Sequence, residues 1–333
     1  GTLNKTEGYN SLADTAGGNP WTTLAPMPTS RYGFGCAVMG DTIIFAVGGY
    51  DDLGNPLDVL EAYKPATNSW ITGWPAMPTE RAFLGAGVVK DSLFAVGGEN
   101  RNFAGLDTVE VYLASSNTWV TKKALLGGPS FGRKGVVCAT PDSNGVVRIY
   151  ALGGQKVDGI YLTANQKYNP VTNAWAARAS IAVPSRAFMS ADVIYDSIYC
   201  FGGQDASSYY NYVSSYNPYA NNWKSESSMI DPRAYSGSGA IEGEGIYVFG
   251  GKTNDAVILK TVEKGYRFGS ISGKATTTMG DTLQGMKVEV LQSGNSKYTA
   301  IVSQTGYYST TGIEPGVYNV RFSDVANDDT TYG

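Results

Sequence analysis

The sequence predicts an all-β protein built from five similar units, and three recurring features predict it. A Gly-Gly pair ends an apolar run five times, an arginine stands upstream of each run, and a tyrosine precedes a tryptophan by seven residues in four units. Self-similarity at a spacing of roughly 50 residues is the signature of a repeat architecture. The glycine pairs are Gly48-Gly49, Gly97-Gly98, Gly153-Gly154, Gly202-Gly203 and Gly250-Gly251.

Each unit is predicted to contain four strands. In the first unit these are GFGCAVM, TIIFAVGG, LDVLEAY and SWITGW, separated by turn residues such as Gly40-Asp41. Small residues in the first strand suit a place where neighbouring sheets converge, and the glycine pair permits a backbone bend that a Cβ would obstruct. Aromatic pairs supply apolar surface for packing between units. They are Tyr63/Trp70, Tyr112/Trp119, Tyr168/Trp175 and Tyr216/Trp223.

The repeat resembles the kelch motif, which implies one four-stranded blade per unit around a central channel. The resemblance covers residues 20–268 and predicts a five-bladed kelch β-propeller. The fifth unit lacks a Tyr–Trp strand, whereas Trp21-Thr22-Thr23-Leu24 reads as a fourth strand with no blade before it. We therefore expect this N-terminal strand to pair with the last unit and close the ring, which leaves no sheet edge exposed. Residues 1–19 show no apolar period and are assigned to an N-terminal extension.

The pattern changes at Gly269, and residues 269–333 form a separate module. The segments SISGK, LQGMKVEV and TGYYSTTGIEPGVYNV resemble the carboxypeptidase-regulatory-like or Cna-B-like module, a small Ig-like or prealbumin-like β-sandwich. The resemblance implies a stalk or spacer in a large extracellular protein. Members of that family usually continue beyond the point where this sequence stops, which leaves three readings: a longer protein, a short sandwich, or a strand added by a neighbouring subunit.

Composition excludes several classes of function. The sequence contains no histidine, which removes Ser–His and Cys–His nucleophiles and histidine metal centres. Charged residues are 16% of the chain and the net charge is −4, so nucleic acid is not an expected partner. No apolar run approaches the ~18 residues of a membrane span. Cys36, Cys138 and Cys200 each lie in an apolar run and are predicted to be buried rather than bridged.

The first candidate site is the arginine that recurs in every unit. In kelch propellers this position lies near the channel mouth, so the resemblance implies a ring that could read acidic groups by bidentate contacts. The alternative is that each arginine holds its own blade together through backbone carbonyls or a nearby acid such as Glu61, Glu110 or Glu263. The five residues are Arg31, Arg81, Arg133, Arg186 and Arg233.

The second candidate site is the set of loops that follow the glycine pairs. Aromatic rings beside amides and carboxylates suit stacking on sugars or a protein interface, although they also occur in ordinary polar loops. The candidates are Tyr50, Asp51, Asn100, Phe103, Tyr161, Asp205, Tyr209 and Tyr210. Asp51-Asp52 and the cluster Asp324…Asp328-Asp329 lack the spacing of a calcium loop, so no metal or other cofactor is predicted.

These observations favour a non-catalytic protein that is secreted or held at a cell surface, with a structural or adhesive role and a protein partner or self-assembly. The alternative is a propeller that recognises glycans through its aromatic loops. A third reading is a carbohydrate-active enzyme that uses paired carboxylates, which sequence alone cannot pair in space. Among kelch relatives, the copper radical oxidases need two histidines and are excluded, whereas sugar mutarotases are not.

Overall fold

The structure is a computed structural model in which strands dominate and one short helix, α1 (Ser11–Thr15), is present among the described residues. It describes residues 2–15, 18–40, 42–141, 147–181, 184–194, 196–241, 244–254, 256–265, 269–276, 284–305, 307–313 and 318–323, with 269–274 and 309–313 as backbone only. The chain divides into two compact units. The first is Gly1–Gly239 with Val248–Glu263, and the second is Ala240–Tyr247 with Lys264–Gly333.

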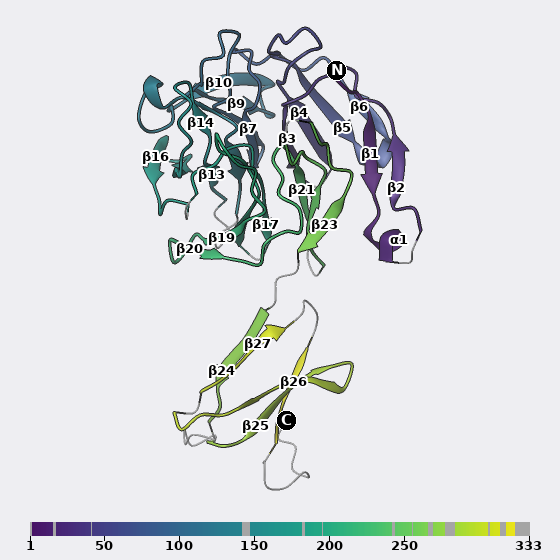
Figure 1. Cartoon of the computed structure of the whole chain (residues 1–333), viewed down its shortest axis with the longest axis vertical. Coiled ribbons are helices and arrows are strands. Elements are labelled where there is room, and N and C mark those ends of the chain that lie inside the picture. The colour runs from purple at the N-terminus through teal and green to yellow at the C-terminus, as the bar shows by residue number, and fades with distance from the viewer. Residues whose placement is uncertain are drawn as a thin grey trace. The chain divides into compact units, whose positions relative to one another are not determined.

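Each predicted unit forms its own antiparallel sheet, which we call the first to fifth repeat sheets (Figure 1). The first contains β3 (Gly35–Met39), β4 (Ile43–Val47), β5 (Leu60–Lys64) and β6 (Ser69–Ile71). The second contains β7 (Gly85–Val89), β8 (Ser92–Val96), β9 (Val109–Leu113) and β10 (Thr118–Lys122). The third contains β12 (Val137–Ala139), β13 (Ile149–Leu152), β15 (Asn165–Asn169) and β16 (Ala174–Ala177). The fourth contains β17 (Ser190–Ile194), β18 (Ser197–Phe201), β19 (Val213–Asn217) and β20 (Asn222–Ser225).

The fifth repeat sheet has three strands among the described residues, β21 (Gly237–Ile241), β22 (Gly245–Phe249) and β23 (Val262–Gly265). Shorter elements are the paired strands β11 (Arg133–Lys134) and β14 (Gln155–Lys156) and the 3₁₀ turns η1 (Pro65–Thr67) and η2 (Pro129–Phe131). No helix among the residues in view is long and apolar enough to cross a membrane.

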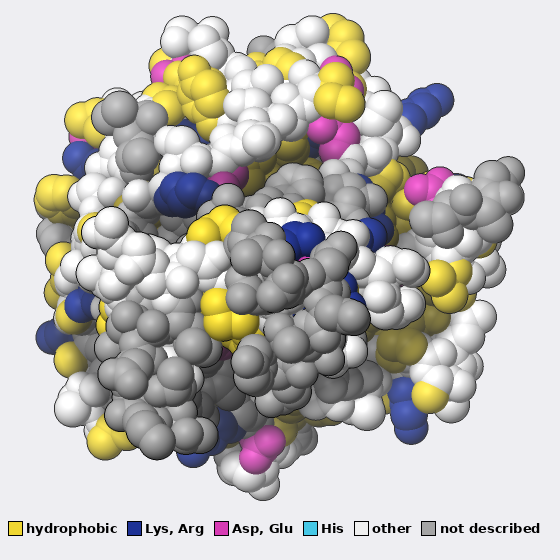
Figure 2. Space-filling view, turned by 90° about the horizontal axis from the view of Figure 1, so that it is seen from below, with side chains coloured by type: hydrophobic (Ala, Val, Ile, Leu, Met, Phe, Trp, Pro, Cys, Tyr) yellow, Lys and Arg dark blue, Asp and Glu magenta, His cyan; other side chains and the backbone are white. Residues whose placement is uncertain are grey.

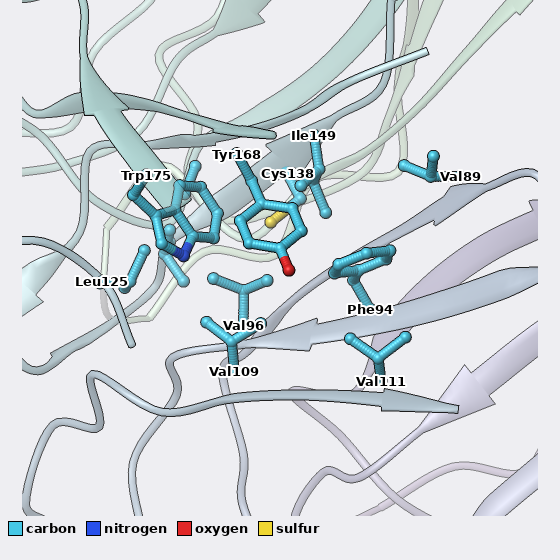
Figure 3. Packing of buried hydrophobic residues seen from close by; sticks show 12 residues of the cluster. Val89, Phe94, Val96, Val109, Val111, Leu125, Cys138, Ile149, Tyr168 and Trp175 are labelled. Atoms are coloured by element: carbon cyan, nitrogen blue, oxygen red, sulfur yellow. The ribbon is translucent and has the colours of Figure 1, made fainter. Parts of the chain in front are cut away.

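The core lies between neighbouring repeat sheets. Figure 3 shows the cluster between the second and third sheets, where Phe94 and Val111 meet Tyr168. The ring centroids of Phe94 and Tyr168 are 5.5 Å apart, an edge-to-face contact. The first strands approach so closely that a Cβ on Gly85 would lie 2.5 Å from Sγ of Cys138. Small residues in the first strands are therefore required by the packing, as the sequence predicts.

Two of the three cysteines are buried, as predicted, but Cys36 is exposed. Cys36 and Val38 lie on the face of β3 that points away from the second repeat sheet, because Gly35 and Ala37 point toward it. The equivalent residues of the second sheet, Ala86 and Val88, pack against the first sheet. Cys36 has no such neighbour among the described residues, which is why the prediction of burial fails there.

The N-terminal residues reproduce the third and fourth strands of a repeat. Strand β1 (Thr6–Tyr9) pairs with β2 (Trp21–Leu24), with Tyr9 opposite Trp21 and the ring centroids 5.2 Å apart. The Tyr63–Trp70 pair of the first repeat sheet has the same register and a distance of 5.4 Å. We call residues 3–25 the N-terminal hairpin.

Hydrogen bonds extend this equivalence. The hydroxyl of Tyr9 donates to Asp14 five residues later, as that of Tyr63 donates to Asn68. The N–H of Arg31 donates to the carbonyl of Leu3, as the N–H of each later arginine donates to a residue before the third strand of the preceding repeat. The flexible or docked extension predicted for residues 1–19 therefore includes, among its described residues, a strand that is equivalent to the third strand of a repeat.

The predicted pairing of Trp21–Leu24 with the fifth unit is wrong, because among the described residues β2 pairs with β1. The reason is that Tyr9 of β1 lies opposite Trp21, so the Tyr–Trp pair is complete within the N-terminal hairpin. Side-chain packing still joins the two, since Phe249 of β22 contacts Trp21 at 5.9 Å and Tyr9 at 5.4 Å between ring centroids.

The second unit contains two small antiparallel sheets. Strands β24 (Gly269–Lys274) and β27 (Tyr307–Ile313) form one, and β26 (Asn295–Ile301), β25 (Lys287–Gln292) and β28 (Asn319–Ser323) form the other. Val288 and Val302 are buried in a core that Tyr308 and Phe322 complete, with those two rings 5.4 Å apart. The predicted acidic cluster at 324–329 lies outside the described residues.

Candidate functional site

The five repeated arginines are buried inside the repeat sheets, with exposed fractions of 0–2%. In the first sheet, Nη1 of Arg31 donates to the carbonyls of Gly48 and Val59 at 3.2 and 3.1 Å. Its Nη2 lies 2.7 Å from the carboxylate of Glu61. The same pairing recurs between Arg81 and Glu110 and between Arg233 and Glu263. The contacts agree with the alternative that the arginines hold the blades, and no exposed anion-binding ring is formed.

Two of the arginines lack a carboxylate partner. Gln166 stands where the first and second sheets have Glu61 and Glu110, and it bonds to the backbone of Leu126 instead. Nε and Nη2 of Arg133 have no hydrogen-bond partner among the described residues. Burial lowers the pKa of Arg133 to about 10. In the fourth sheet Arg186 donates to the hydroxyl of Ser214 at 3.0 Å.

A chain of backbone hydrogen bonds links one repeat to the next through the second residue after each arginine. The N–H of Phe83 donates to Gly33, that of Gly135 to Phe83, that of Phe188 to Gly135 and that of Tyr235 to Phe188. All five residues have φ between 52 and 64°, the left-handed region that side chains disfavour. The constraint places these residues, one from each repeat, next to one another.

The aromatic members of this chain form a cluster with two further tyrosines. The rings of Phe188 and Tyr235 stack at 4.5 Å, and Phe83 lies 5.4 Å from Phe188. Tyr32 and Tyr50 contact Phe83 at 6.1 and 5.7 Å. Residues from four repeat sheets meet here, so the cluster lies at the axis around which the sheets are arranged. We call Tyr32, Tyr50, Phe83, Phe188 and Tyr235 the axial cluster.

Charged groups border the axial cluster. The carboxylate of Glu99 is buried, lies 2.6 Å from Nζ of Lys134 and accepts a hydrogen bond from the Tyr50 hydroxyl at 3.0 Å. Burial and the adjacent Glu99 carboxylate raise the pKa of Tyr50 far above its usual value, so the phenol stays protonated and donates. Nζ of Lys252 lies 4.9 Å from the ring centroid of Tyr235, a cation–π distance.

The solvent side of this region is shallow. Tyr32 and Tyr235 are 46% and 37% exposed, while Phe188 beneath them is buried. An open pocket of about 370 Å³ lies beside Tyr32 and is lined by Thr2, Tyr32, Asp51 and Asp52. Such a surface offers aromatic faces with polar edges, which suits recognition of a protein segment or a sugar better than enclosure of a small molecule.

The predicted polar loop residues are engaged within their own loops. Asp51 accepts hydrogen bonds from the N–H groups of Leu53 and Asn55. Asn100 accepts from Asn102 and Ala104, and Asp205 accepts from Ser207 and Ser208. These Asx-type bonds stabilise the turns. The three side chains therefore shape the loops that border the axial cluster.

The predicted aromatic residues divide into two groups. Tyr50 belongs to the axial cluster, and Tyr161 and Tyr209 pack against the buried cluster that contains Phe188. Tyr210 is elsewhere, stacked on Tyr212 at 5.2 Å with its hydroxyl bonded to Asp205. Phe103 is 64% exposed on its own loop.

Sequence reasoning missed several residues of the region: Tyr32, Phe83, Glu99, Lys134, Phe188, Tyr235 and Lys252. A signal was available, because the second residue after each repeated arginine is either glycine or aromatic. Three-dimensional adjacency was not visible, since these residues lie about 50 positions apart in the chain.

One face of the molecule can be examined for a concentration of charge among the described residues. Figure 2 shows lysine, arginine and acidic side chains scattered among hydrophobic and other groups on that face, without a single-sign patch. Within the part of the chain that the structure describes, no group of three Cys, Asp or Glu residues is placed to hold a metal ion.

Comparison with known proteins gives matches over most of the repeats. Residues 85–280 match the family model described as the KLHDC2/KLHL20/DRC7 Kelch-repeats domain, and residues 30–73 match the Kelch motif. Many solved structures are similar. One, titled "Structure of YjhT", aligns with a TM-score of 0.62 at 18% identity, over 78% of this chain and 93% of that chain. No curated protein matches the sequence.

Proposed function

The chain belongs to the kelch-repeat family, and from this premise we propose that it is a non-catalytic interaction protein of an extracellular cell surface. In this proposal the five repeat sheets are blades of a β-propeller, and a protein partner binds over the axial cluster. The second unit, as a β-sandwich of the carboxypeptidase-regulatory-like kind, links the propeller to its attachment or to a neighbouring molecule.

The observation that carries the proposal is the composition of the axial cluster. Tyr32 and Tyr235 present partly exposed rings above Phe83 and Phe188, which are held by a rigid backbone chain. Large aromatic side chains on a preorganised support are the groups that dominate protein interfaces, because they bury much area at a small cost in conformational entropy. The Lys252 ammonium lies beside Tyr235 at a cation–π distance, so the border of the cluster carries positive charge.

The state of the nearby carboxylates favours binding over catalysis. Glu99 is already paired with Lys134 and Tyr50, and Asp51 and Asp205 are saturated by loop N–H groups. Acid–base hydrolysis of a glycoside needs one carboxyl group that is poised to protonate and a second that is free to attack or to activate water. Carboxylates held in this way are poor candidates for either role.

The experiment places a photo-crosslinking phenylalanine analogue at Tyr235 and, in a matched protein, at Tyr219. Tyr219 is 53% exposed in the turn between β19 and β20, away from the arginine end of the strands. Both proteins are applied to the intact surface of the producing cells. We expect a discrete adduct from position 235. An excess of unlabelled wild-type protein should suppress this adduct, whereas an excess of an unlabelled Tyr32→Ala/Tyr235→Ala variant should not. Equal adduct patterns at the two positions would refute the proposal.

A second candidate function is glycan recognition, which the exposed rings of Tyr32, Phe103 and Tyr235 favour because sugars stack on such faces. A glycan array probed with the wild-type protein and with the Tyr32→Ala/Tyr235→Ala variant distinguishes glycan recognition from protein binding. A defined glycan preference that the double variant loses would replace the protein partner by a carbohydrate.

A further inference from the structure

The third repeat sheet carries a lysine at a position that the first two sheets use for apolar packing. Lys167 lies opposite Tyr150 in the register of β15 and β13 and is partly buried. The equivalent residues of the first and second sheets are Ala62 and Val111, which lie opposite phenylalanines and are buried between neighbouring sheets. An ammonium group at such a boundary costs free energy unless an anion compensates its charge.

Two arginines lie on the same face of the third sheet as Lys167. Arg148 precedes Tyr150 by two residues. Arg178 follows Ala176 by two residues, and Ala176 lies opposite Lys167 in β16. Side chains two positions apart point to the same side of a sheet, and Tyr150 packs against apolar residues of β18 and β19. All three cations therefore face the fourth repeat sheet.

Contacts with two tyrosines hold Lys167 and Arg178 near each other. Nζ of Lys167 lies 5.9 Å from the ring centroid of Tyr150. Nε of Arg178 donates to the hydroxyl of Tyr216 at 3.3 Å, and its Nη2 donates to the carbonyl of Pro218 at 3.4 Å. The ring centroids of Tyr150 and Tyr216 are 5.7 Å apart. These contacts join the lysine and the arginine into one group at the boundary of the third and fourth sheets.

No carboxylate neutralises this group within the part of the chain that the structure describes. The ion pairs found there include none with Arg148, Lys167 or Arg178. Burial lowers the pKa of Lys167, and the positive charges of Arg178 and Arg148 lower it further. Positive charges that are held together in this way create a potential that attracts an anion.

The donors of the group match an oxyanion with more than one charge. A guanidinium presents a planar fork of N–H donors, and an ammonium presents three donors on a compact charge. Sulfate and phosphate groups offer several acceptor oxygens, and a phosphate ester carries close to two negative charges at neutral pH. A carboxylate would compensate one of the three positive charges, whereas a sulfate or phosphate group compensates more of the charge through the same contacts.

We propose that Arg148, Lys167 and Arg178 form a binding site for the sulfate or phosphate group of a ligand, at the boundary between the third and fourth repeat sheets. The ammonium and the two guanidinium groups donate hydrogen bonds to the oxyanion, and the tyrosine contacts hold Lys167 and Arg178 ready for it. These residues lie outside the axial cluster, and the proposal does not depend on the function proposed for that cluster.

The test measures acylation of individual lysines by acetic anhydride in the full chain, with and without inorganic sulfate or inorganic phosphate, and mass spectrometry resolves each site. Only the neutral amine reacts, so a bound oxyanion, which favours the protonated form, should slow acylation of Lys167. Lys224 is the internal reference, because its side chain is 74% exposed on the neighbouring sheet. We expect one of the two anions to slow Lys167 relative to Lys224 by about fivefold or more, the effect of a rise in pKa of about 0.7.

Sodium chloride at the same ionic strength separates binding from screening and should leave the ratio of the two rates unchanged. The anion that protects Lys167 at the lower concentration identifies the group, sulfate or phosphate, that the site takes. Equal slowing by chloride, or an unchanged ratio with both oxyanions, would overturn the proposal.

An arginine variant tests the composition of the site. Arg148→Gln should raise the anion concentration needed for half-maximal protection of Lys167 by about tenfold, because it removes a charge-assisted donor. Arg101→Gln is the matched control, since Arg101 is an exposed arginine that pairs with Glu80 in the second repeat, and it should leave the protection unchanged. Equal effects of the two substitutions, or no effect of Arg148→Gln, would count against the assignment.

Thermal unfolding gives a readout that does not depend on lysine chemistry. A ligand that binds only the folded protein raises its Tm, but sulfate and phosphate also stabilise proteins generally because they are excluded from the protein surface. The wild-type protein is therefore compared with Lys167→Met, which places an apolar side chain where Ala62 and Val111 stand, and with Lys224→Met. We expect the anion to raise Tm less in Lys167→Met than in the other two proteins. A rise of the same size in all three would refute the site.

Discussion

Nη2 of Arg31 lies 2.7 Å from Oε2 of Glu61, and both side chains are buried within the first repeat sheet. The pair spans the sheet from the segment before its first strand to its third strand, and the Glu61 carboxylate also accepts from the hydroxyl of Thr29 at 2.6 Å. The pair therefore ties the segment before the first strand to the third strand of the same sheet.

Replacing Glu61 with Gln should destabilise the propeller, because it leaves the Arg31 charge buried without its partner. Breaking a buried ion pair typically costs about 3–5 kcal/mol. Glu7→Gln is the matched control, since Glu7 has the same place in its strand but is exposed, and its effect should stay within about 0.5 kcal/mol. Urea unfolding followed by tryptophan fluorescence measures both, because all six tryptophans precede the second unit's sheets in the sequence. Equal effects would contradict the interpretation.

Arg133→Met and Arg81→Met each remove one buried positive charge, yet we expect them to lower the free energy of unfolding by different amounts. Arg81→Met leaves the Glu110 carboxylate buried and alone, with a cost of about 3–5 kcal/mol. Arg133 has no carboxylate partner, so its removal leaves no buried charge behind. We expect Arg133→Met to change the free energy of unfolding by less than half as much as Arg81→Met does. A larger loss for Arg133→Met would contradict the expectation that a stranded carboxylate decides the cost.

Gly135→Ala tests the backbone chain that links the repeats. Gly135 has φ of 62°, and a Cβ there would lie 2.6 Å from the ring of Phe188. Gly159 also has positive φ, 83°, but nothing lies within 4 Å of its Cβ position. Gly159→Ala should therefore cost about 1–2 kcal/mol from backbone strain alone. Gly135→Ala should cost about 1–3 kcal/mol more, because the added methyl overpacks the cluster.

Acid should loosen the second unit through Glu289. Hydrogen bonds from Lys287 and from Arg321, the latter at 2.6 Å, hold the pKa of Glu289 below its usual value. A carboxylate with a lowered folded-state pKa stabilises the fold above its unfolded pKa of about 4.3, and this contribution disappears as pH falls through the folded pKa. Amide hydrogen exchange in β25 should therefore accelerate as the pH falls below about 4.3, after correction for the intrinsic exchange rates. Glu289→Gln should remove the dependence, and its persistence in that variant would assign the effect to another group.

The repeat fold was predictable because its signals are local and recur. The Gly-Gly pairs, the arginines and the Tyr–Trp pairs each fix a backbone bend, a buried ion pair or a packing contact, and five copies make the pattern visible. The N-terminal hairpin was missed because twelve positions, and not seven, separate Tyr9 from Trp21. The five extra residues contain α1, which conceals a pairing that the strand register restores.

The axial cluster was only partly predictable for a different reason. Loop residues such as Asp51 and Asn100 were predicted to be functional because they are polar. Their side chains instead accept hydrogen bonds from backbone N–H groups of their own turns. Phe83 and Phe188 were not among the predicted site residues, and the left-handed backbone at both positions brings them to the axis. Neither the conformation nor the convergence of distant repeats can be inferred from composition.

The positions of the repeat sheets and the side chains at the axis are set by different groups. The sheets are linked by a backbone chain that runs through Gly33, Phe83, Gly135, Phe188 and Tyr235. Each link is made by main-chain N–H and C=O groups, so the spacing of the sheets does not depend on which side chain the linking residue carries. Both glycine and bulky aromatic residues already occur along it. The linking position can therefore hold glycine or an aromatic residue, provided that the neighbouring ring repacks, so the surface at the axis can change while the main-chain links between the sheets are kept.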